Sequence, residues 1–388
     1  MKPYNILPCG LFVFSCDQHC RPLHTDPPKG ASIAVKYSLR LKRLGILERA
    51  SHTASVIIRP AMLCRLLLSL IFASTALAEP QIQVTKVWDA AQHSAFTDLA
   101  RWHNEWWIVF REAEAHVGGD GKIRVLHSTT GDTWESAALI AEEGTDLRDP
   151  KLSITPDDKL MLVAGGSIYK GGTKLLARQP RVAFSKDGRE WSAPQRILGE
   201  GDWLWRVTWQ HATAWGASYK TSAPEGTAED TGEWTLTLYS SEDGIAWTAV
   251  APLKVSGRPN ETTLRFDIEG DCTALVRRES DDKEGWLGTA KSPFTDWTWK
   301  PIGRAIGGPN FLMPPGRIVV AGRDYRPDGA KTAIGPVVDG KWLPSITLPS
   351  GGDTSYPGLF WNRGEWWITY YSSHEGKSAI YLAKVRGL

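Results

Sequence analysis

A seven-residue pattern, Ser-x-Asp-Gly-x-x-Trp, recurs along the chain at a nearly constant spacing. It occupies residues 185–191 and 241–247, and a variant with threonine in the aspartate position occupies 128–134. Asp-Gly favours a tight turn, because glycine tolerates positive φ and aspartate can accept hydrogen bonds from the nearby backbone. The tryptophan is then expected to fold back under the turn. A repeat of about 50 residues built from short strands is typical of a β-propeller with one blade per repeat.

The first 78 residues differ from the repeating part. Residues 62–65 form a basic flank, 66–76 form an apolar core, and the small residues at 76–78 resemble a cleavage site. We therefore expect a secretory signal peptide at 62–78, and a mature protein that starts at or near Glu79 and is secreted or periplasmic. The apolar core is too short for a membrane span. Residues 1–61 are interpreted as a non-native N-terminal extension.

Removal of residues 1–78 changes the charge of the chain. Lys+Arg falls from 45 to 35 and Asp+Glu from 43 to 40, so the formal net charge changes from +2 to −5. A mildly acidic exported domain has no electrostatic basis for binding nucleic acid. Cys272 is the only cysteine after residue 78, which excludes an intramolecular disulfide and a cysteine-based metal site. We expect it to be a small buried side chain.

From residue 80 onward the chain divides into six units, each opening with a β-hairpin. The expected hairpins span 96–111, 149–165, 205–217, 261–277, 309–323 and 356–370. Continuous apolar runs such as 106–110 fit strands that are buried on both faces. The sequence therefore predicts an all-β, six-bladed β-propeller over residues 79–388. We expect the strand at 82–87 to complete the last blade by pairing with 378–385.

Polar residues gather at the open ends of these hairpins. If residues equidistant from each turn lie opposite one another, the open ends converge around one mouth of the central channel. They carry Asp98 with Arg111, Arg148 with Asp149, Arg206, Glu261 with Arg277, Asn310 with Arg323, and Tyr356 with Tyr370. Clustered arginines and acids are costly to bury without a compensating ligand, so this rim is the predicted binding or catalytic site.

The repeated pattern resembles the Asp-box, or BNR repeat, of the sialidase superfamily, and the similarity extends over about 90–388. The segment Asn260-Glu261, together with Arg277, resembles the sialidase segment that carries the activating glutamate and an arginine of the triad. Residues 353–358 resemble the segment that carries the tyrosine nucleophile, here Tyr356, and Arg323 falls where the third arginine is expected. The resemblance implies that the arginines bind a carboxylated sugar and that the tyrosine attacks it.

The chain also departs from the family pattern. Where sialidases begin the first blade with Phe/Tyr-Arg-Ile-Pro, this sequence has 96–99 as Phe-Thr-Asp-Leu, and the first triad arginine is absent. Arg111, on the neighbouring strand, is the proposed substitute. The family's acid lies on the loop at 112–121, where His116 and Asp120 are both candidates. Trp205, in the aromatic segment 203–206, is expected to stack on a sugar.

The resulting interpretation is a secreted exo-glycosidase of terminal sialic acid or a related carboxylated sugar. A tyrosine deprotonated by a neighbouring glutamate avoids the repulsion between a carboxylate nucleophile and an anionic substrate. Two alternatives stay open: the first is a propeller polysaccharide lyase, with His116 or Tyr356 as its base, or a hydrolase for uronic or other acidic glycans, and the second is a non-catalytic glycan-binding propeller. We expect an acidic glycan as partner, a monomer, no membrane span, no cofactor and no metal.

Overall fold

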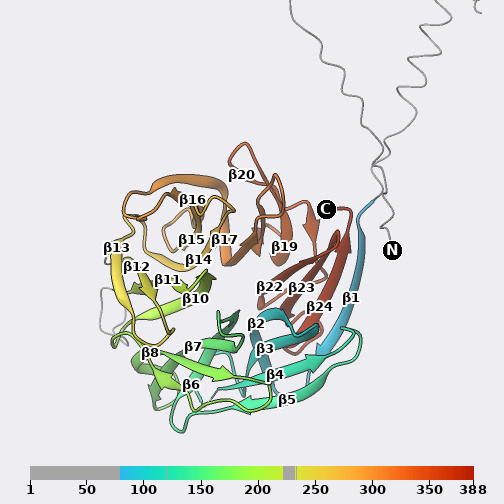
Figure 1. The fold of residues 1–388 in the computed structure, drawn as a ribbon. Coiled ribbons are helices and arrows are strands. Elements are labelled where there is room, and N and C mark those ends of the chain that lie inside the picture. Colours follow the sequence, from blue (N-terminus) through green and yellow to red (C-terminus); the bar gives the residue numbers. More distant parts are fainter. Residues whose placement is uncertain (1–78, 120, 222–231, 233) are drawn as a thin grey trace, which may run out of the picture. The chain divides into compact units, whose positions relative to one another are not determined.

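The computed structural model describes residues 79–119, 121–221, 232 and 234–388, and the expectations for 1–78 and for Asp120 lie outside this part. Every regular element described is a β-strand, and four separate sheets have four strands each. They contain β2–β5, β6–β9, β10–β13, and β22–β24 with β1. A fifth sheet joins β14 to β20 through β17, which pairs with β16 along one part and with β18 along the other. β17 thus divides this sheet into two blade units, and the predicted six-bladed propeller is confirmed (Figure 1).

The first three blades follow directly on one another. The first blade contains β2 (His93–Trp102), β3 (Glu105–Ala113), β4 (Lys122–Ser128) and β5 (Glu135–Ile140). The second contains β6 (Asp146–Ile154), β7 (Leu160–Lys170), β8 (Lys174–Ser185) and β9 (Gln195–Arg196). The third contains β10 (Trp203–Gln210), β11 (Thr213–Lys220), β12 (Thr235–Ser241) and β13 (Thr248–Pro252).

The last three blades complete the ring. They contain β14 (Pro259–Phe266), β15 (Cys272–Arg278), β16 (Glu284–Ala290), β17 (Thr298–Leu312), β18 (Val319–Arg326), β19 (Gly329–Val338), β20 (Lys341–Trp342), β21 (Ile346–Thr347), β22 (Thr354–Asn362), β23 (Glu365–Ser372) and β24 (Ala379–Arg386). β1 (Gln81–Trp88) pairs antiparallel with β24, as expected, so the two ends of the described chain close the circle (Figure 1). The described residues contain no helix that could span a membrane.

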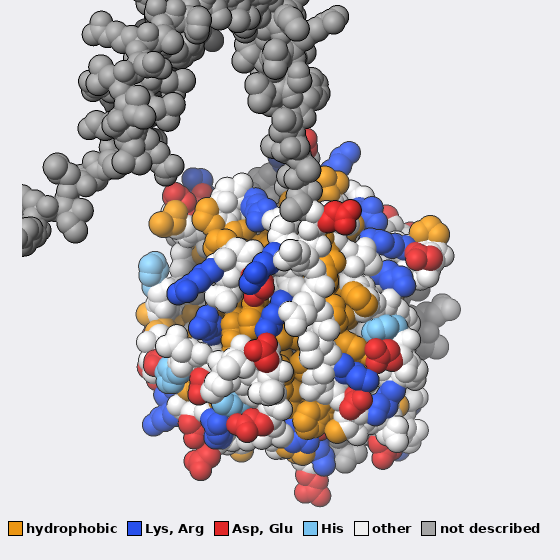
Figure 2. Space-filling view, turned by 90° about the vertical axis from the view of Figure 1, so that its right-hand side faces the viewer, with side chains coloured by type: hydrophobic (Ala, Val, Ile, Leu, Met, Phe, Trp, Pro, Cys, Tyr) orange, Lys and Arg blue, Asp and Glu red, His pale blue; other side chains and the backbone are white. Residues whose placement is uncertain are grey.

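The apolar strands form the core between the sheets. Residues 107–110 of β3 are completely buried, as are Ile368 and Tyr370 of β23. Cys272 is buried too, in agreement with the sequence analysis. Charged side chains of both signs are interspersed over the side of the domain shown in Figure 2. The core is therefore built from the predicted apolar return strands, with a mixed charged surface around it.

The recurring sequence pattern forms a turn stabilised by its own side chains. Asp187 accepts hydrogen bonds from the backbone N–H groups of Arg189 and Glu190, and Gly188 N donates to the hydroxyl of Ser185 at 2.8 Å. The indole of Trp191 folds back and donates to the carbonyl of Gly188. The turn at 241–247 repeats these contacts.

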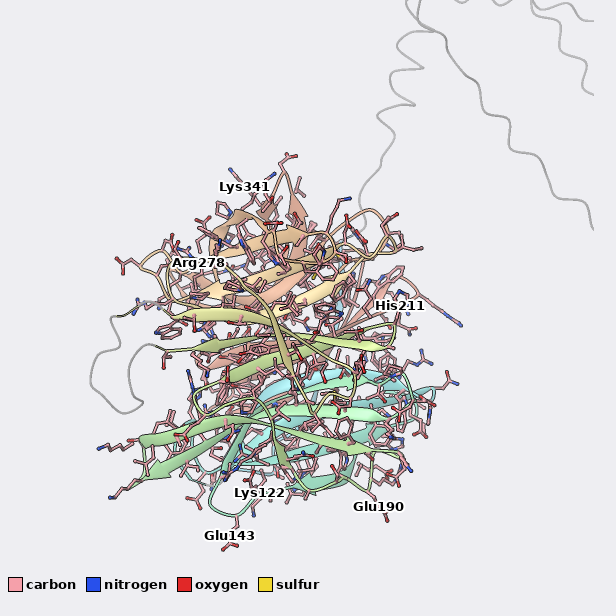
Figure 3. All side chains as sticks on the ribbon, turned by 60° about the vertical axis from the view of Figure 1, so that its left-hand side comes forward. Lys122, Glu143, Glu190, His211, Arg278 and Lys341 are labelled. Carbon is pink, nitrogen blue, oxygen red and sulfur yellow. The ribbon has the colours of Figure 1, made fainter. Side chains whose placement is uncertain are left out.

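These turns lie at the strand ends opposite the predicted site. Figure 3 shows Glu190, in one of them, and His211, in a hairpin turn, toward one end of the strands and Arg278 toward the other. A cavity of about 800 Å³ is also on the turn side, where Trp191, Trp209 and Asp243 contribute to its lining. It is remote from the chemistry described below, which lies at the open ends of the hairpins.

Candidate active site

Each innermost strand carries a β-bulge at the same position. In all six blades two residues of this strand oppose a single residue of the next strand. The bulged pairs are Phe96-Thr97, Asp149-Pro150, Trp205-Arg206, Asn260-Glu261, Gly308-Pro309 and Tyr356-Pro357. A bulge bends the strand and re-aims its side chains. Six equivalent bulges therefore direct side chains from all blades toward the centre of one mouth.

Backbone conformation marks several of these bulges as special. Phe96, Asp149 and Tyr356 have positive φ angles of 63°, 50° and 54°, and Gly308 has 57°. A non-glycine residue in this region costs free energy and is found mainly where the surrounding structure or a function requires it. Only glycine fits at 308, because a Cβ there would lie 2.7 Å from Cδ2 of Tyr356. The close approach of this glycine helps to fix the tyrosine ring.

Tyr356, Glu261 and Arg277 form a direct hydrogen-bonded cluster. The hydroxyl of Tyr356 donates to Oε1 of Glu261 at 2.5 Å, and Nη1 of Arg277 donates to the same oxygen at 2.9 Å. Arg277 Nη1 also lies 3.2 Å from the tyrosine hydroxyl oxygen. The other glutamate oxygen, Oε2, accepts from the backbone N–H of Gly308 at 2.9 Å. Glu261 is thus held with one oxygen aimed at the phenol.

The environment keeps the proton on Tyr356 in the resting protein. Burial, together with the nearby Glu261 carboxylate, raises the pKa of Tyr356 well above its usual range, against the opposing effect of Arg277 and Arg323. The resting tyrosine is therefore a neutral phenol. Its short hydrogen bond places Oε1 of Glu261 where it could accept the phenol proton, which is the geometry that a nucleophile and its general base would require.

A second cluster, built around Arg323, lies beside the tyrosine ring. The guanidinium of Arg323 lies 5.7 Å from the ring centre of Tyr356, and its Nε donates to the carbonyl of Thr354 at 2.8 Å. Its Nη2 reaches the hydroxyl of Tyr371 at 3.1 Å and Asp353 at 3.5 Å. Arg277 and Arg323 therefore flank Tyr356 from two blades.

The floor of the site is aromatic and contains a buried lysine. The rings of Phe96 and Trp205 lie 5.1 and 5.3 Å from the ring of Tyr356. Trp205 is only 1% exposed, so it supports the tyrosine from below, and the expected stacking surface for a sugar is not seen. Nζ of Lys151 lies 4.5 Å from the Trp205 ring centre and donates to the carbonyl of Pro150. Lys151 was not among the residues predicted from the sequence.

Lys151 should produce a measurable pH dependence of stability. Burial, followed by repulsion from Arg206, lowers its pKa from 10.5 to about 8. Between these two pH values the unfolded chain binds the proton and the folded chain does not, so the free energy of unfolding rises with pH. The gain should be about 3 kcal/mol. Urea unfolding of the wild type between pH 8 and 10.5 should show this rise in the free energy of unfolding, and Lys151→Met should lack it. Lys159→Met is the control, because Lys159 forms a half-exposed ion pair with Asp157, and its free energy of unfolding should change with pH as in the wild type. Parallel curves for all three proteins would contradict it.

Arg148 and Asp149 lie at the rim beside this floor. The guanidinium of Arg148 lies 5.0 Å from the ring centre of Phe96 and donates to the carbonyl of His116. Asp149 is partly exposed as a residue, but its Oδ1 is buried without a hydrogen-bond partner, and this burial raises the pKa of the carboxyl group even though Arg148 and Lys151 act in the opposite direction. A carboxyl group with a raised pKa is suited to hold a proton for transfer.

Three other predicted residues do not reach the mouth. Arg111 is completely buried and binds Asp146 through two nitrogens, at 2.6 and 3.0 Å. Asp98 is buried in an ion pair with Arg206 at 2.8 Å. The expected pairing of these two residues with each other is wrong, because Asp98 lies on the turn side of the bulge and pairs with Val109, whereas Arg111 lies beyond the bulge and pairs with Ala95. These contacts make the three residues part of the interior, and Arg111 does not supply a free third arginine.

The register of the fifth blade also differs from the expectation. Asn310 pairs with Ala321, and Arg323 pairs with Gly307. Arg323 nevertheless reaches Tyr356, with its guanidinium 5.7 Å from the ring centre. His116, on the loop after β3, is half-exposed and hydrogen-bonds Asp353, while Asp120 lies outside the described residues. The structure thus brings Tyr356, Glu261, Arg277 and Arg323 together, with Arg148, Asp149 and His116 at the edge.

Comparison with known proteins identifies the same fold. No family model and no curated protein matches the sequence. A protein of unknown function from Dyadobacter fermentans is 18% identical with a TM-score of 0.68, covering 79% of this chain and 99% of its own. An α-L-arabinofuranosidase from Fusarium graminearum, in complex with an iminosugar inhibitor, is 14% identical with a TM-score of 0.60, covering 78% and 96%.

A sialidase from Trypanosoma rangeli completes the comparison. It is 11% identical with a TM-score of 0.58, and the match covers 78% of this chain but 59% of the sialidase. These identities are low, so the similarity establishes the fold and leaves the activity to be argued from the site. The chain has a sialidase-like β-propeller fold.

Proposed function

We propose that this protein is a retaining, exo-acting glycoside hydrolase in which Tyr356 is the nucleophile and Glu261 its general base. The observation that carries the proposal is the 2.5 Å hydrogen bond from the tyrosine hydroxyl to the glutamate, with Arg277 bound to both groups. A buried tyrosine in a strained backbone conformation, fixed against a carboxylate, is difficult to explain by folding alone. The sialidase and arabinofuranosidase folds among its structural neighbours agree with this proposal.

The reaction would proceed in two steps. The phenol oxygen of Tyr356 attacks the anomeric carbon while its proton moves to Oε1 of Glu261, and an acid protonates the departing glycosidic oxygen. Arg277 stabilises the negative charge that develops on the phenol oxygen. Water, which gives a proton to the conjugate base of the acid, then attacks the anomeric carbon of the glycosyl–tyrosine intermediate, and the departing phenol oxygen takes its proton back from Glu261. Asp149 and His116 are the described candidates for the acid, and Asp120 stays a candidate from the sequence.

The proposed substrate carries a carboxylate near the reacting carbon. Arg277 reaches the hydroxyl of Tyr356 and Arg323 lies 5.7 Å from its ring centre, and guanidinium groups bind carboxylates through paired hydrogen bonds. A neutral phenol attacks such a centre without the repulsion that a carboxylate nucleophile would meet. With Arg111 occupied by Asp146, we propose a two-arginine site in place of a triad, with Arg148 at its edge.

The arginine pair predicts a charge-selective effect of Arg277→Lys. Lysine cannot retain the paired contacts of a guanidinium, and loss of a charge-assisted hydrogen bond typically costs about 1.5–3 kcal/mol. Affinity for an acidic sugar should therefore fall by roughly 10- to 100-fold in calorimetry, with little change for neutral sugars. Arg278→Lys is the control, because its guanidinium bonds Ser256 and Asp282 away from the mouth. Equal losses of affinity for acidic and neutral sugars would show that Arg277 stabilises the fold and does not bind a carboxylate.

A second candidate function is hydrolysis of a neutral furanoside. The full engagement of Arg111 by Asp146 favours it, since one cation fewer faces the mouth. A panel of acidic and neutral aryl glycosides, assayed with NMR detection of the first anomer released, tests both candidates. Release of an acidic sugar with retained configuration supports the proposal, and turnover of neutral furanosides alone supports the second candidate. Formation of an unsaturated uronide would indicate a lyase, and saturable binding without turnover a glycan-binding protein.

A further inference from the structure

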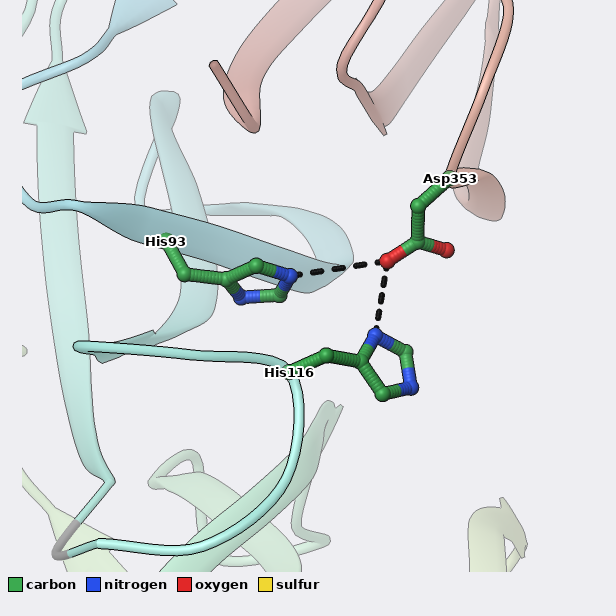
Figure 4. Close-up of side chains that lie close together, drawn as sticks. All are labelled: His93, His116 and Asp353. Atoms are coloured by element: carbon green, nitrogen blue, oxygen red, sulfur yellow. Dashed lines mark hydrogen bonds and ion pairs between the residues drawn. The ribbon is translucent and has the colours of Figure 1, made fainter.

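Three potential metal ligands from distant parts of the chain meet beside the candidate active site. His93 begins β2, His116 lies on the loop after β3, and Asp353 directly precedes β22. Oδ2 of Asp353 lies 2.7 Å from Nδ1 of His116 and 3.5 Å from Nε2 of His93, and the three donor atoms all lie within 4.8 Å of one another. Figure 4 shows both imidazole rings directed at this one carboxylate oxygen. The sequence separations are too large for a local turn to explain the meeting.

The spacing of the three atoms fits a small divalent cation. Zinc binds imidazole nitrogen and carboxylate oxygen at about 2.0–2.2 Å, so neighbouring ligand atoms in a tetrahedral site are roughly 3.3 Å apart. The observed separations from Asp353 bracket this value. Two imidazoles and one carboxylate are also the donor set of catalytic zinc sites and of other first-row metal sites with open positions.

The surroundings hold Asp353 and His116 in place. Oδ1 of Asp353 accepts a hydrogen bond from the hydroxyl of Tyr371 at 2.7 Å, which leaves Oδ2 directed at the histidines. The ring of His116 packs edge-on against Phe96, with 5.2 Å between ring centres. Hydrogen bonds from outer residues orient metal ligands in this way. The side chains of His116 and Asp353 are 46% and 32% exposed, so solvent or a ligand can reach the cluster.

Other histidines with acidic neighbours lack this geometry. His127 contacts Glu105 through Nε2 and Glu135 through Nδ1, so the two carboxylates lie on opposite sides of the ring. His103 pairs with Asp158 at 2.8 Å. Among the described residues, only the cluster of His93, His116 and Asp353 brings three such donors to one point.

We propose that His93, His116 and Asp353 bind a first-row divalent cation, with Zn²⁺ as the best match to the donor set. Its remaining coordination positions face the open side of the cluster and would take water or an oxygen of a bound sugar. The sequence analysis expected no metal, so this site departs from that expectation. The proposed metal site does not depend on the glycosidase mechanism. The competing explanation is a hydrogen-bond relay in which the two histidines bond to Asp353 and no metal is bound.

Metal binding by the whole purified protein tests this proposal. After chelator treatment and dialysis against Zn²⁺, mass spectrometry of the metal content should give one equivalent per chain, and Co²⁺ should produce visible absorption bands of a four- or five-coordinate site. His116→Phe, which retains the packing on Phe96, should weaken binding at least tenfold. His103→Ala, which removes a His–Asp pair of similar length, should bind like the wild type.

The negative outcomes are equally specific. Absence of stoichiometric Zn²⁺ or Co²⁺ binding would overturn the proposal and favour the hydrogen-bond relay. Equal affinity in His116→Phe and wild type would place any bound metal elsewhere, as would equal weakening in His103→Ala. Circular dichroism of each variant shows whether it is folded, and His93→Phe provides an independent second test of the same ligand set.

Discussion

Tyr356→Phe is expected to fold normally and to lose nearly all turnover. The substitution removes one oxygen atom, which is the proposed nucleophile, and leaves the aromatic packing against Phe96 and Trp205 in place. Loss of a nucleophile with its general base should reduce kcat by about 10³-fold or more, equivalent to at least roughly 4 kcal/mol of transition-state stabilisation. Single-turnover and steady-state rates on the best substrate of the glycoside panel measure this directly.

Tyr370→Phe is the matched control for this variant. Tyr370 lies on β23, which pairs with the strand of Tyr356 in the same blade. It is fully buried, and its hydroxyl donates to the carbonyl of Pro349 at 2.8 Å, outside the site. Tyr370→Phe should lower the free energy of unfolding by about 1 kcal/mol and leave kcat close to the wild-type value. Comparable activity losses in both variants would show that a buried tyrosine hydroxyl matters for folding here and would remove the case for Tyr356 as nucleophile.

Glu261→Gln is expected to reduce turnover by about 10²- to 10⁴-fold, the usual contribution of a general base. The amide is close in shape to the carboxylate but cannot take the tyrosine proton. The double variant with Tyr356→Phe should be little slower than either single variant, because the two residues act as one unit. Rate constants for the three proteins measure this coupling.

Glu142→Gln serves as the control for loss of a paired carboxylate. Glu142 binds both Nε and Nη2 of Arg181, at 2.6 and 3.0 Å, away from the mouth. It should cost stability and leave kcat near the wild-type value. If the effects of Glu261→Gln and Tyr356→Phe simply multiply in the double variant, the two residues contribute independently and the proposed proton transfer between them is contradicted.

Local sequence signals predicted most of the fold. The Asp-Gly turns and the hairpin positions follow from short-range rules on glycine, aspartate and apolar runs, and the pairing of β1 with β24 follows from closure of the ring. Six repeats of similar length then leave few arrangements other than a closed ring. The pairing of Tyr356 with Glu261 came from resemblance, and their contact is present in the structure.

The bulges explain why other site residues could not be placed from the sequence. Counting from each turn requires the closing pair of the hairpin to be known, and one extra residue per inner strand then shifts every position beyond the bulge. Asp98 and Asn310 lie on the turn side of their bulges and pair with Val109 and Ala321, whereas Arg111 and Arg323 lie beyond them and pair with Ala95 and Gly307, so the expected pairings were wrong. Phe96 and Asp149 have positive φ at their bulges, but neither is a glycine, and nothing else in the sequence marks a bulge there.

Contacts between distant blades were also beyond sequence reasoning. Arg111 is neutralised by Asp146 of the second blade, and the cluster of His93, His116 and Asp353 joins the first and last blades. Nothing in a single sequence specifies which of several acids meets a given arginine across a ring. Lys151 likewise looks like an ordinary strand residue until its burial beneath Trp205 is known.

Covalent trapping tests the central claim most directly. A fluorinated glycosyl fluoride of the best substrate slows hydrolysis of the intermediate, so the sugar should accumulate on the nucleophile. Peptide mass spectrometry after proteolysis is predicted to find one sugar attached to Tyr356, and none in Tyr356→Phe. A sugar attached to Glu261 or to any other residue, or time-dependent inactivation that persists in Tyr356→Phe, would contradict the assignment of Tyr356 as the nucleophile.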